Sequence, residues 1–375
     1  MTAKPATRVG IWPPLRARSF WHSREEVLPF PLSIPSCRIY SRARQGLWNG
    51  VRALGLRPGD EVLAPAYHQG AEIEAFVRAG LQCRFYRIDE SLSPLSSDLE
   101  DLLTDRTRAL HVIHYWGMPQ DVSRLRDWCD RRGLFLIEDC AQAFLAKSNG
   151  EWVGQTADLA VYCLYKSFGL PDGAAAYCRA DLPLPDRQTS IGAWPLARRL
   201  GSSLTSRSVL MARLRDRFVP EHEDVRPEGG FLQDEYELGD PDRSSTLLST
   251  YLLPRVIDSA AASRRRANYE YLLDRLRGLI PKPFERLPDG AVPIAFPVAS
   301  DSPTDLAAAI RAKGIVAGVL WPTRHACVPA GDWSRADFFR HRVLALPVHQ
   351  ELSGNELNRI ADAVLGAVGD REIPV

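Results

Sequence analysis

The sequence predicts an α/β protein built on a mostly parallel sheet with helices on both faces. Two observations support this prediction. From residue 60 onward, short apolar runs bounded by turn residues alternate with segments of helical period, which is the order of repeated strand and helix units. The apolar run at 134–137 also ends abruptly in Glu138 and Asp139, as a buried parallel strand does where its carboxyl end opens on a ligand crevice.

The elements of the first half follow in order along the chain. Leu47, Val51 and Leu54 recur at helical spacing and predict a helix that starts near residues 43–45 and stops at Gly55. The expected strands after it are a short one that ends at Pro65, then 82–89, 108–115 and 134–137, and the expected helices are 70–78, 97–103 and 121–132. A further strand, 159–164, delivers Lys166 to the same sheet edge, just before a Pro-Asp-Gly turn.

The second half predicts a smaller unit. Residues 181–243 lack a clear period, and short helices are expected around 206–218 because the segment is too long for a bare loop. One long helix is expected at 246–279, bent near Pro254. The remaining pattern gives strands at 292–298, 316–320 and 343–346 and helices at 303–313 and 354–368, the last with Ser353 as its N-cap. This is the pattern of a small C-terminal α+β domain.

The expected domain organisation has three parts. Residues 1–35 form an arm laid over the body or over a partner subunit, or else a disordered tail. Residues 36–250 form a large domain, and residues 251–375 form a linking helix and the small domain. A chain of 375 residues is long enough for two packed cores.

Composition excludes several classes of partner. The net charge is +1, so neither nucleic acid nor an anionic membrane is expected as the main partner. The arginine run within 263–269 is expected to be a solvated, paired helix face.

The start lacks a signal-peptide core, and no apolar run could span a bilayer, so a cytoplasmic protein acting on small molecules is expected. Seven scattered cysteines without metal spacing predict reduced thiols and no metal site.

Asp139 and Lys166 are the candidate reactive pair. A lysine at an apolar strand end is either a surface side chain or an amine kept reactive by partial burial. A fixed carboxylate beside it favours the second interpretation, because pyridoxal 5'-phosphate (PLP) chemistry requires both groups. The lysine holds the cofactor as a Schiff base, and the carboxylate keeps the ring nitrogen protonated.

The residues around this pair carry a family resemblance. Ile-Glu-Asp-Cys-Ala-Gln-Ala at 137–143, a lysine 166 − 139 = 27 residues after the aspartate, and Asp-Gly at 172–173 resemble the DegT/StrS family of PLP-dependent sugar aminotransferases. The resemblance implies the PLP-dependent transferase fold type I, with a seven-stranded-type sheet, and a homodimer with sites at the subunit interface. It also implies transfer of an amino group from an amino acid, with glutamate expected, to a keto sugar that is usually nucleotide-linked.

The resemblance assigns roles to four positions around the cofactor ring. Lys166 is the catalytic Schiff-base lysine, and Asp139 is the partner of the ring nitrogen. Gln142 is expected to donate a hydrogen bond to the phenolic oxygen. His68, or Gln69 if the alignment slips by one residue, is expected to stack on the ring.

Three further positions are candidates for holding the cofactor phosphate. The helix start near Arg44 and Gln45 offers backbone N–H groups and a positive dipole end. Arg44 stands where the family has a hydroxyl residue, and it either makes a charge-assisted bond to phosphate or points into solvent. Cys163 stands where many relatives have serine, and it is either a weak donor to phosphate or a core thiol.

Two other functions stay open. One is a PLP enzyme of another reaction type, such as a dehydratase or an amino-acid-modifying enzyme. Dehydratase relatives carry histidine in place of the lysine, so Lys166 weighs against that branch. The other is a non-catalytic regulator that keeps the fold, against which the intact Asp139, Gln142 and Lys166 weigh.

Overall fold

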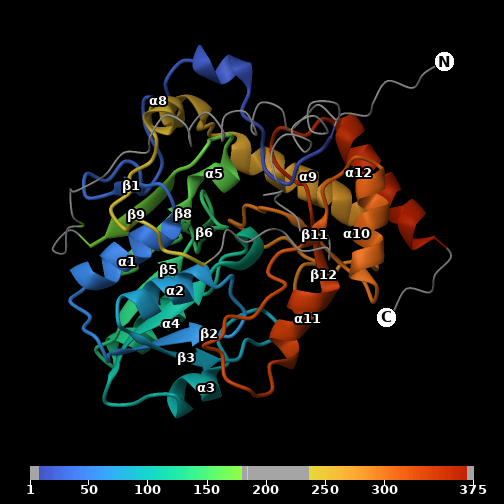
Figure 1. Cartoon of the computed structure of the whole chain (residues 1–375). Helices are drawn as coiled ribbons and strands as arrows, with labels where there is room; N and C mark the ends of the chain where they lie inside the picture. Colours follow the sequence, from blue (N-terminus) through green and yellow to red (C-terminus); the bar gives the residue numbers. More distant parts are fainter. Residues whose placement is uncertain (1–7, 180–183, 185–235, 370–375) are drawn as a thin grey trace, which may run out of the picture.

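A seven-stranded sheet forms the centre of the structure, a computed structural model that describes residues 8–179, 184 and 236–369 (Figure 1). In spatial order its strands are β1 (Arg38–Tyr40), β9 (Ala174–Cys178), β8 (Leu159–Cys163), β5 (Phe135–Asp139), β4 (Thr107–Ile113), β2 (Glu61–Pro65) and β3 (Gln82–Tyr86). The five strands from β8 to β3 are mutually parallel, and β9 runs antiparallel to both of its neighbours. The predicted mostly parallel sheet is therefore confirmed.

Helices cover both faces of this sheet. They are α1 (Ala43–Ala53), α2 (Ala71–Arg78), α3 (Ser96–Asp101) and α4 (Val122–Asp130). Ile137 and Val161 pack in one buried cluster with α1 and α2, whereas Leu136 packs in another with α4. Because successive strand residues face opposite sides of a sheet, the same alternation places Asp139 and Cys163 on the α1 and α2 side.

Several strand boundaries differ from the prediction. The strand expected at 82–89 ends at Tyr86, the one expected at 108–115 ends at Ile113, and β1 and β9 were not expected as strands. Lys166 lies in a short helix, α5 (Leu164–Ser167), directly after β8. Phe168 N–H closes this turn by donating to the Leu164 carbonyl at 2.9 Å.

The prediction of one bent helix at 246–279 was wrong. The structure has two helices, α8 (Leu247–Val256) and α9 (Ala261–Arg275), and Pro254 lies inside the first. The break comes at Ile257, whose backbone is extended with φ −65° and ψ 132°. Asp258 then accepts a hydrogen bond from Ala260 N–H at 2.8 Å, which gives α9 a new start.

The C-terminal part is a small α+β unit beside the large sheet (Figure 1). Its strands β10 (Phe296–Ala299), β12 (Val343–Leu346) and β11 (Gly318–Val319) form an antiparallel sheet in that order, flanked by α10 (Pro303–Ala312), α11 (Ser334–Arg342) and α12 (Gly354–Val368). Ser353 caps α12 as predicted, since its Oγ accepts a hydrogen bond from Glu356 N–H at 3.3 Å. Helix α11 was not expected. The domain boundary at residue 250 stays a prediction.

The described part of the N-terminal arm lies over the body. Val9 and Ile11 are buried, and Val9 forms a parallel bridge with Ile315. Arg16 Nε lies 2.7 Å from a carboxylate oxygen of Glu351. Residues 1–7 and almost all of the aperiodic region, including the helix expected at 206–218, lie outside the described residues.

Two further predictions concern the whole chain. All seven cysteines are free thiols, as expected. Among the helices of the described ranges, none combines the length and the apolar character needed to cross a bilayer.

Candidate active site

Asp139 and Lys166 lie at the same edge of the large sheet. Asp139 is the last residue of β5, and it stands in register with Val161 on the neighbouring parallel strand β8. Lys166 follows the end of β8 by three residues. Because parallel strands end at a common edge, the sequence pattern of two apolar runs is enough to bring an acid and an amine together.

Asp139 is a buried carboxylate that holds its proton up to neutral pH. Its side chain is 8% exposed, and Oδ1 accepts a hydrogen bond from Ala141 N–H at 2.8 Å. Burial raises the pKa of Asp139 to about 7, and the charge of Glu72 adds to this effect, whereas the Ala141 hydrogen bond and Lys166 oppose it. Such a carboxyl group is suited to sharing a proton with a basic ring nitrogen.

Lys166 presents an amine without a fixed partner. Its Nζ makes no hydrogen bond or ion pair with any residue that the structure describes. Burial lowers the pKa of Lys166, but the nearby acidic groups of Cys163, Tyr165, Asp139 and Glu72 outweigh it, so the pKa lies above its usual value. The amine is therefore charged at neutral pH until a bound group changes its surroundings.

Glu72 is a site residue that the sequence reasoning missed. It is buried near the start of α2, where its carboxylate accepts hydrogen bonds from Gln69 N–H at 2.9 Å and Gly70 N–H at 3.1 Å. Its charge raises the pKa of both Asp139 and Lys166. A glutamate in the first turn of a helix usually caps backbone N–H groups, so the sequence alone offered no sign of a second role.

Gln142 and His68 occupy different surroundings. Gln142 Oε1 accepts a hydrogen bond from Trp116 N–H at 2.6 Å, and its Nε2 has no hydrogen-bond partner within the described residues. His68 is fully buried, and neither ring nitrogen has a partner in that same set. Its ring lies 5.8 Å from that of Phe85. Burial lowers the pKa of His68 well below its usual value, so the ring is neutral, and its stacking role stays a prediction.

The three candidates for the phosphate lie on or beside α1. Arg44 Nη1 donates to the Glu237 carbonyl at 2.8 Å, and Gln45 Nε2 donates to the Asp240 carbonyl at 2.7 Å. Both side chains thus bind the segment that follows the undescribed region. Cys163 is buried at the end of β8 on the α1 side. Their contact with a phosphate stays a prediction.

Arg42 is a second residue that the sequence reasoning missed. Its guanidinium lies 4.6 Å from the ring centre of Tyr165, and Tyr165 is the neighbour of Lys166. This places a cation between the start of α1 and the lysine turn. Residue type alone could not single it out, because Arg42 and Arg44 both lie at the expected helix start.

A buried carboxylate, Asp172, holds the elements around the lysine turn together. Ser41 Oγ donates to it at 3.0 Å, Thr246 Oγ1 at 3.0 Å and Ser249 Oγ at 2.5 Å. These residues belong to the entry to α1 and to the start of α8. Asp172, in the turn after Lys166, thereby joins the start of α1 and the start of α8.

Replacing Asp172 with alanine should destabilise the fold by about 3 kcal/mol, because three buried hydroxyl groups lose a charged acceptor. Urea unfolding of the cofactor-free protein measures this. Asp121→Ala is the matched control, since the exposed Asp121 caps α4 and its loss should cost only about 1 kcal/mol. Equal losses in the two variants would contradict the assignment of Asp172 as the tie between these elements.

The site residues fit PLP. That cofactor needs an amine for its aldehyde carbon, a carboxylate for its ring nitrogen and donors for its phenolic oxygen. Lys166 has an amine without a fixed partner, Asp139 is a buried carboxyl group with a raised pKa, and the Gln142 amide nitrogen has no described hydrogen-bond partner. The start of α1, near Arg42, supplies the positive end of a helix for a phosphate.

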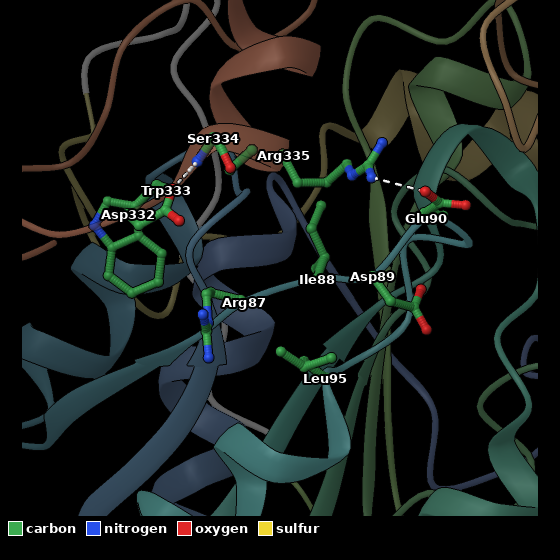
Figure 2. A pocket seen from close by; sticks show the side chains of 10 residues that line it. Arg87, Ile88, Asp89, Glu90, Leu95, Asp332, Trp333, Ser334 and Arg335 are labelled. Atoms are coloured by element: carbon green, nitrogen blue, oxygen red, sulfur yellow. Dashed lines mark hydrogen bonds and ion pairs between the residues drawn. The ribbon is translucent and has the colours of Figure 1, made fainter.

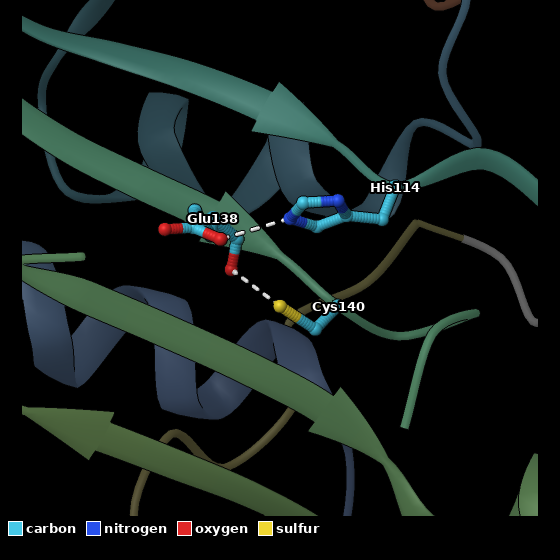
Figure 3. A group of neighbouring side chains, drawn as sticks. All are labelled: His114, Glu138 and Cys140. Carbon is cyan, nitrogen blue, oxygen red and sulfur yellow. Dashed lines mark hydrogen bonds and ion pairs between the residues drawn. The ribbon is translucent and has the colours of Figure 1, made fainter. Parts of the chain in front are cut away.

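Three buried side chains on the opposite face of β5 form a separate cluster (Figure 3). His114, Glu138 and Cys140 lie close enough to hold a metal ion. However, His114 Nδ1 accepts a hydrogen bond from Gln120 N–H at 3.0 Å, so its Nε2 carries the proton and donates to Glu138 at 2.9 Å. Glu138 also accepts from Gly154 N–H at 2.7 Å. These bonds leave no lone pair on His114 for a metal, and the cluster joins the ends of β4 and β5.

A cleft of about 270 Å³ lies away from this site (Figure 2). It opens between the segment after β3 and the start of α11, and Trp333 and Arg335 line one wall. Arg335 is paired with Glu90 at 3.1 Å. Four strand spacings separate β3 from β8, or roughly 20 Å, so this cleft is distinct from the Lys166 site.

The fold and the paired strand ends define a class. The arrangement is that of the PLP-dependent transferases of fold type I, and the fold class predicted from the sequence is confirmed. The crystal structure of DesV from S. venezuelae in complex with a ketimine intermediate superimposes with a TM-score of 0.63 and 26% sequence identity, over 88% of this chain and 83% of that one.

Residues 40–170 match the sequence profile of the DegT/DnrJ/EryC1/StrS aminotransferase family. GDP-perosamine synthase of Vibrio cholerae is 32% identical over 143 residues, which cover 38% of this chain and only 39% of that protein. The dTDP-3-amino-3,4,6-trideoxy-alpha-D-glucose transaminase of Streptomyces venezuelae is 28% identical over 331 residues, 84% of this chain and 78% of that protein.

Proposed function

We propose that this chain is a PLP-dependent aminotransferase that moves an amino group from an amino acid, with glutamate expected, to a keto sugar carried on a nucleotide. The placement of Asp139 and Lys166 at the ends of neighbouring parallel strands is the observation that carries the proposal. The relatives named as transaminases of dTDP-linked sugars support the class of acceptor.

The residues divide the work between binding and proton transfer. Lys166 Nζ would hold the cofactor covalently and, once a donor amine displaces it, would take the proton from the donor's α-carbon. Asp139 would hold the proton of the ring nitrogen, and the Gln142 amide would donate to the phenolic oxygen. When bound, PLP supplies an electron sink for the electron pair that the α-carbon releases.

The electrostatics of the site support this division. A lysine is a base only when it is neutral, and the acidic groups around Lys166 raise its pKa. An Asp139 carboxylate that has given its proton to a ring nitrogen would be held in an ion pair with that ring.

The assembly and the location are part of the proposal. We infer a homodimer in the cytoplasm, with small-molecule substrates and without nucleic acid or membrane as partners. Exposed apolar side chains support a subunit contact: Trp21 and Val27 on the arm and Leu247 on α8 are 81%, 80% and 84% exposed. The arm and α8 touch, because Tyr251 OH donates to the Phe20 carbonyl at 3.0 Å. Sedimentation would give the subunit number.

A spectroscopic titration tests the function. Purified protein is titrated with PLP while its visible absorbance is followed, and glutamate is then added. We expect a visible band from the covalent link to Lys166, which glutamate removes while 2-oxoglutarate forms. A panel of nucleotide-linked keto sugars then identifies the acceptor. A bound cofactor that ignores every amino donor would indicate another reaction type, and failure to bind PLP would contradict the proposal.

A further inference from the structure

Arg265 is a buried cation without a carboxylate. It lies on α9 and is only 2% exposed. Its guanidinium makes three hydrogen bonds: Nη2 to the Ser167 carbonyl at 2.6 Å, Nε to Gln350 Oε1 at 2.7 Å and Nη1 to the Pro293 carbonyl at 3.3 Å. Within the described ranges it has no acidic partner. Burying a charge without an opposite charge costs free energy of desolvation. The groups that bind the Arg265 guanidinium therefore indicate what this side chain does.

The arginine run was expected to be a solvated, paired face, and for Arg265 that expectation was wrong. Arg264 fits it, since it is exposed and pairs with Asp258. Arg265 points inward because it lies on the side of α9 that faces the body, as the buried Tyr269 and Leu272 do. These residues lie four and seven positions further on, which is one helix face.

The Ser167 carbonyl is the point where two side chains meet. Gln350 Nε2 donates to it at 3.0 Å, and Arg265 donates to it at 2.6 Å while also binding Gln350. The three groups therefore form a closed triangle of hydrogen bonds. All three residues are buried, so water does not compete for these bonds.

This carbonyl belongs to the turn that carries Lys166. Ser167 is the last residue of α5, a helix of only four residues. A helix this short is not stable on its own, and its last carbonyl groups lack hydrogen-bond partners within the helix. Phe168 N–H closes the single turn by donating to the Leu164 carbonyl at 2.9 Å. The triangle supplies the missing partner for Ser167, one residue from the lysine.

The two donors come from outside the large sheet. Arg265 lies on α9, and Gln350 follows β12 of the small sheet. A guanidinium suits this position because its rigid planar fork reaches three acceptors in different directions. A lysine amine at the same place could not span the Ser167 carbonyl, the Pro293 carbonyl and Gln350 together.

We propose that Arg265 and Gln350 are positioning residues that fix the direction of the Lys166 amine by holding the Ser167 carbonyl. The inference rests on the proposed function, in which Lys166 is the covalent anchor and the base. Through this triangle the C-terminal part of the chain sets the geometry of Lys166, in the short helix after β8. Neither side chain is assigned any contact with substrate or cofactor.

The test begins with the cofactor-free protein. Arg265→Met is compared with Arg266→Met, a matched control on the same helix. Arg266 also donates to two carbonyls, those of Pro288 and Ala291, at 2.7 and 2.9 Å, but it does not touch α5. Amide hydrogen exchange at Phe168 reports on the turn. We expect exchange there to be about 10- to 100-fold faster in Arg265→Met, because a charged hydrogen bond is lost, and unchanged in Arg266→Met.

A second measurement follows the lysine itself. The rate at which Lys166 Nζ reacts with trace acetic anhydride, read by mass spectrometry, should change in Arg265→Met at pH values where global stability is unaffected, and should not change in Arg266→Met. Arg265→Lys keeps the charge and loses the fork, so it should not restore the wild-type rates. Covalent PLP uptake at Lys166, trapped with borohydride, should slow by about 10-fold or more.

The combination of variants sharpens the result. Gln350→Leu removes one of the two donors to Ser167 and the acceptor of Arg265 Nε, but it keeps the donor from Arg265 to Ser167. It should therefore give a smaller effect, and it serves as the test if Arg265→Met does not fold. In the double variant Arg265→Met/Gln350→Leu, the fold-change in rate should be smaller than the product of the fold-changes in the two single variants, since both residues act on one carbonyl. Phe168 exchange and Lys166 reactivity equal to those of Arg266→Met in a folded Arg265→Met protein would overturn the inference.

The two proposals fail in different ways. The exchange and acylation measurements need no cofactor. A wild-type protein that binds no PLP would refute the proposed function, whereas an Arg265→Met protein that takes up PLP at the wild-type rate would refute only the positioning role.

Discussion

Replacing Lys166 with alanine is expected to abolish both covalent PLP uptake and amino transfer. The variant loses the only amine that the described residues place at this strand edge, and with it the proposed covalent anchor and the proposed base for the α-carbon proton. Loss of a general base alone lowers a rate by about 10²- to 10⁴-fold, and loss of the covalent anchor adds to this. The visible absorbance of the PLP-treated protein and the formation of 2-oxoglutarate from glutamate measure the two effects.

Lys147 provides the control for this prediction. Its amine lies 4.4 Å from the ring centre of Trp152, in the short strand β6 (Lys147–Ser148), and it has no part in the proposed site. Lys147→Ala should take up PLP and transfer amino groups as the wild type does. An undiminished covalent band in Lys166→Ala would mean that another lysine holds the cofactor, and the assignment of the site would be wrong.

Local patterns in the sequence were enough to predict the central strands. The apolar runs that became β5 and β8 end in chemistry-bearing residues, and parallel strands end at one edge, so Asp139 and Lys166 could be placed together without knowing any distance. The short turn α5 could not be foreseen, because it depends on bonds from distant side chains to the Ser167 carbonyl.

The residues that sequence reasoning missed share a physical reason. Glu72 and Arg265 are charged residues in helices, where a solvent-exposed side chain is the usual expectation. Their burial is decided by what packs against the helix from elsewhere in the chain. For Arg265 the partners are 98 and 85 positions away at Ser167 and Gln350, a separation that no local pattern encodes.

Asp139→Asn should lower amino transfer by about 10²- to 10⁴-fold while leaving Lys166 able to bind PLP. An amide cannot keep the ring nitrogen protonated, so the electron sink is weakened while the covalent anchor remains. Absorbance after PLP addition should therefore resemble that of the wild type, and the rate with glutamate should fall. Asp127→Asn, on α4 and remote from the strand ends, is the control that should leave both unchanged.

Asp139→Asn should also change the free energy of unfolding. In contrast to its harm to activity, it should stabilise the protein at higher pH. In the cofactor-free protein, burial and then Glu72 raise the pKa of Asp139 from 3.8 to about 7. Between these values the unfolded chain has lost the proton and the folded chain still holds it, so wild-type stability falls as pH rises through this window. Asparagine does not titrate, so the variant avoids this loss of unfolding free energy. Above both pKa values the loss amounts to roughly 4 kcal/mol.

Urea unfolding at pH 5 and pH 8 separates this effect from most others, because groups that do not interact with Asp139 titrate alike in the two proteins and cancel in their difference. The stability of Asp139→Asn relative to the wild type should be greater at pH 8 than at pH 5. Glu72→Gln in the wild-type background should shrink that pH-dependent difference, since Glu72 contributes to the raised pKa. A difference that is constant with pH would mean that Asp139 is already ionised at pH 5, and that the site holds no proton for a ring nitrogen to share.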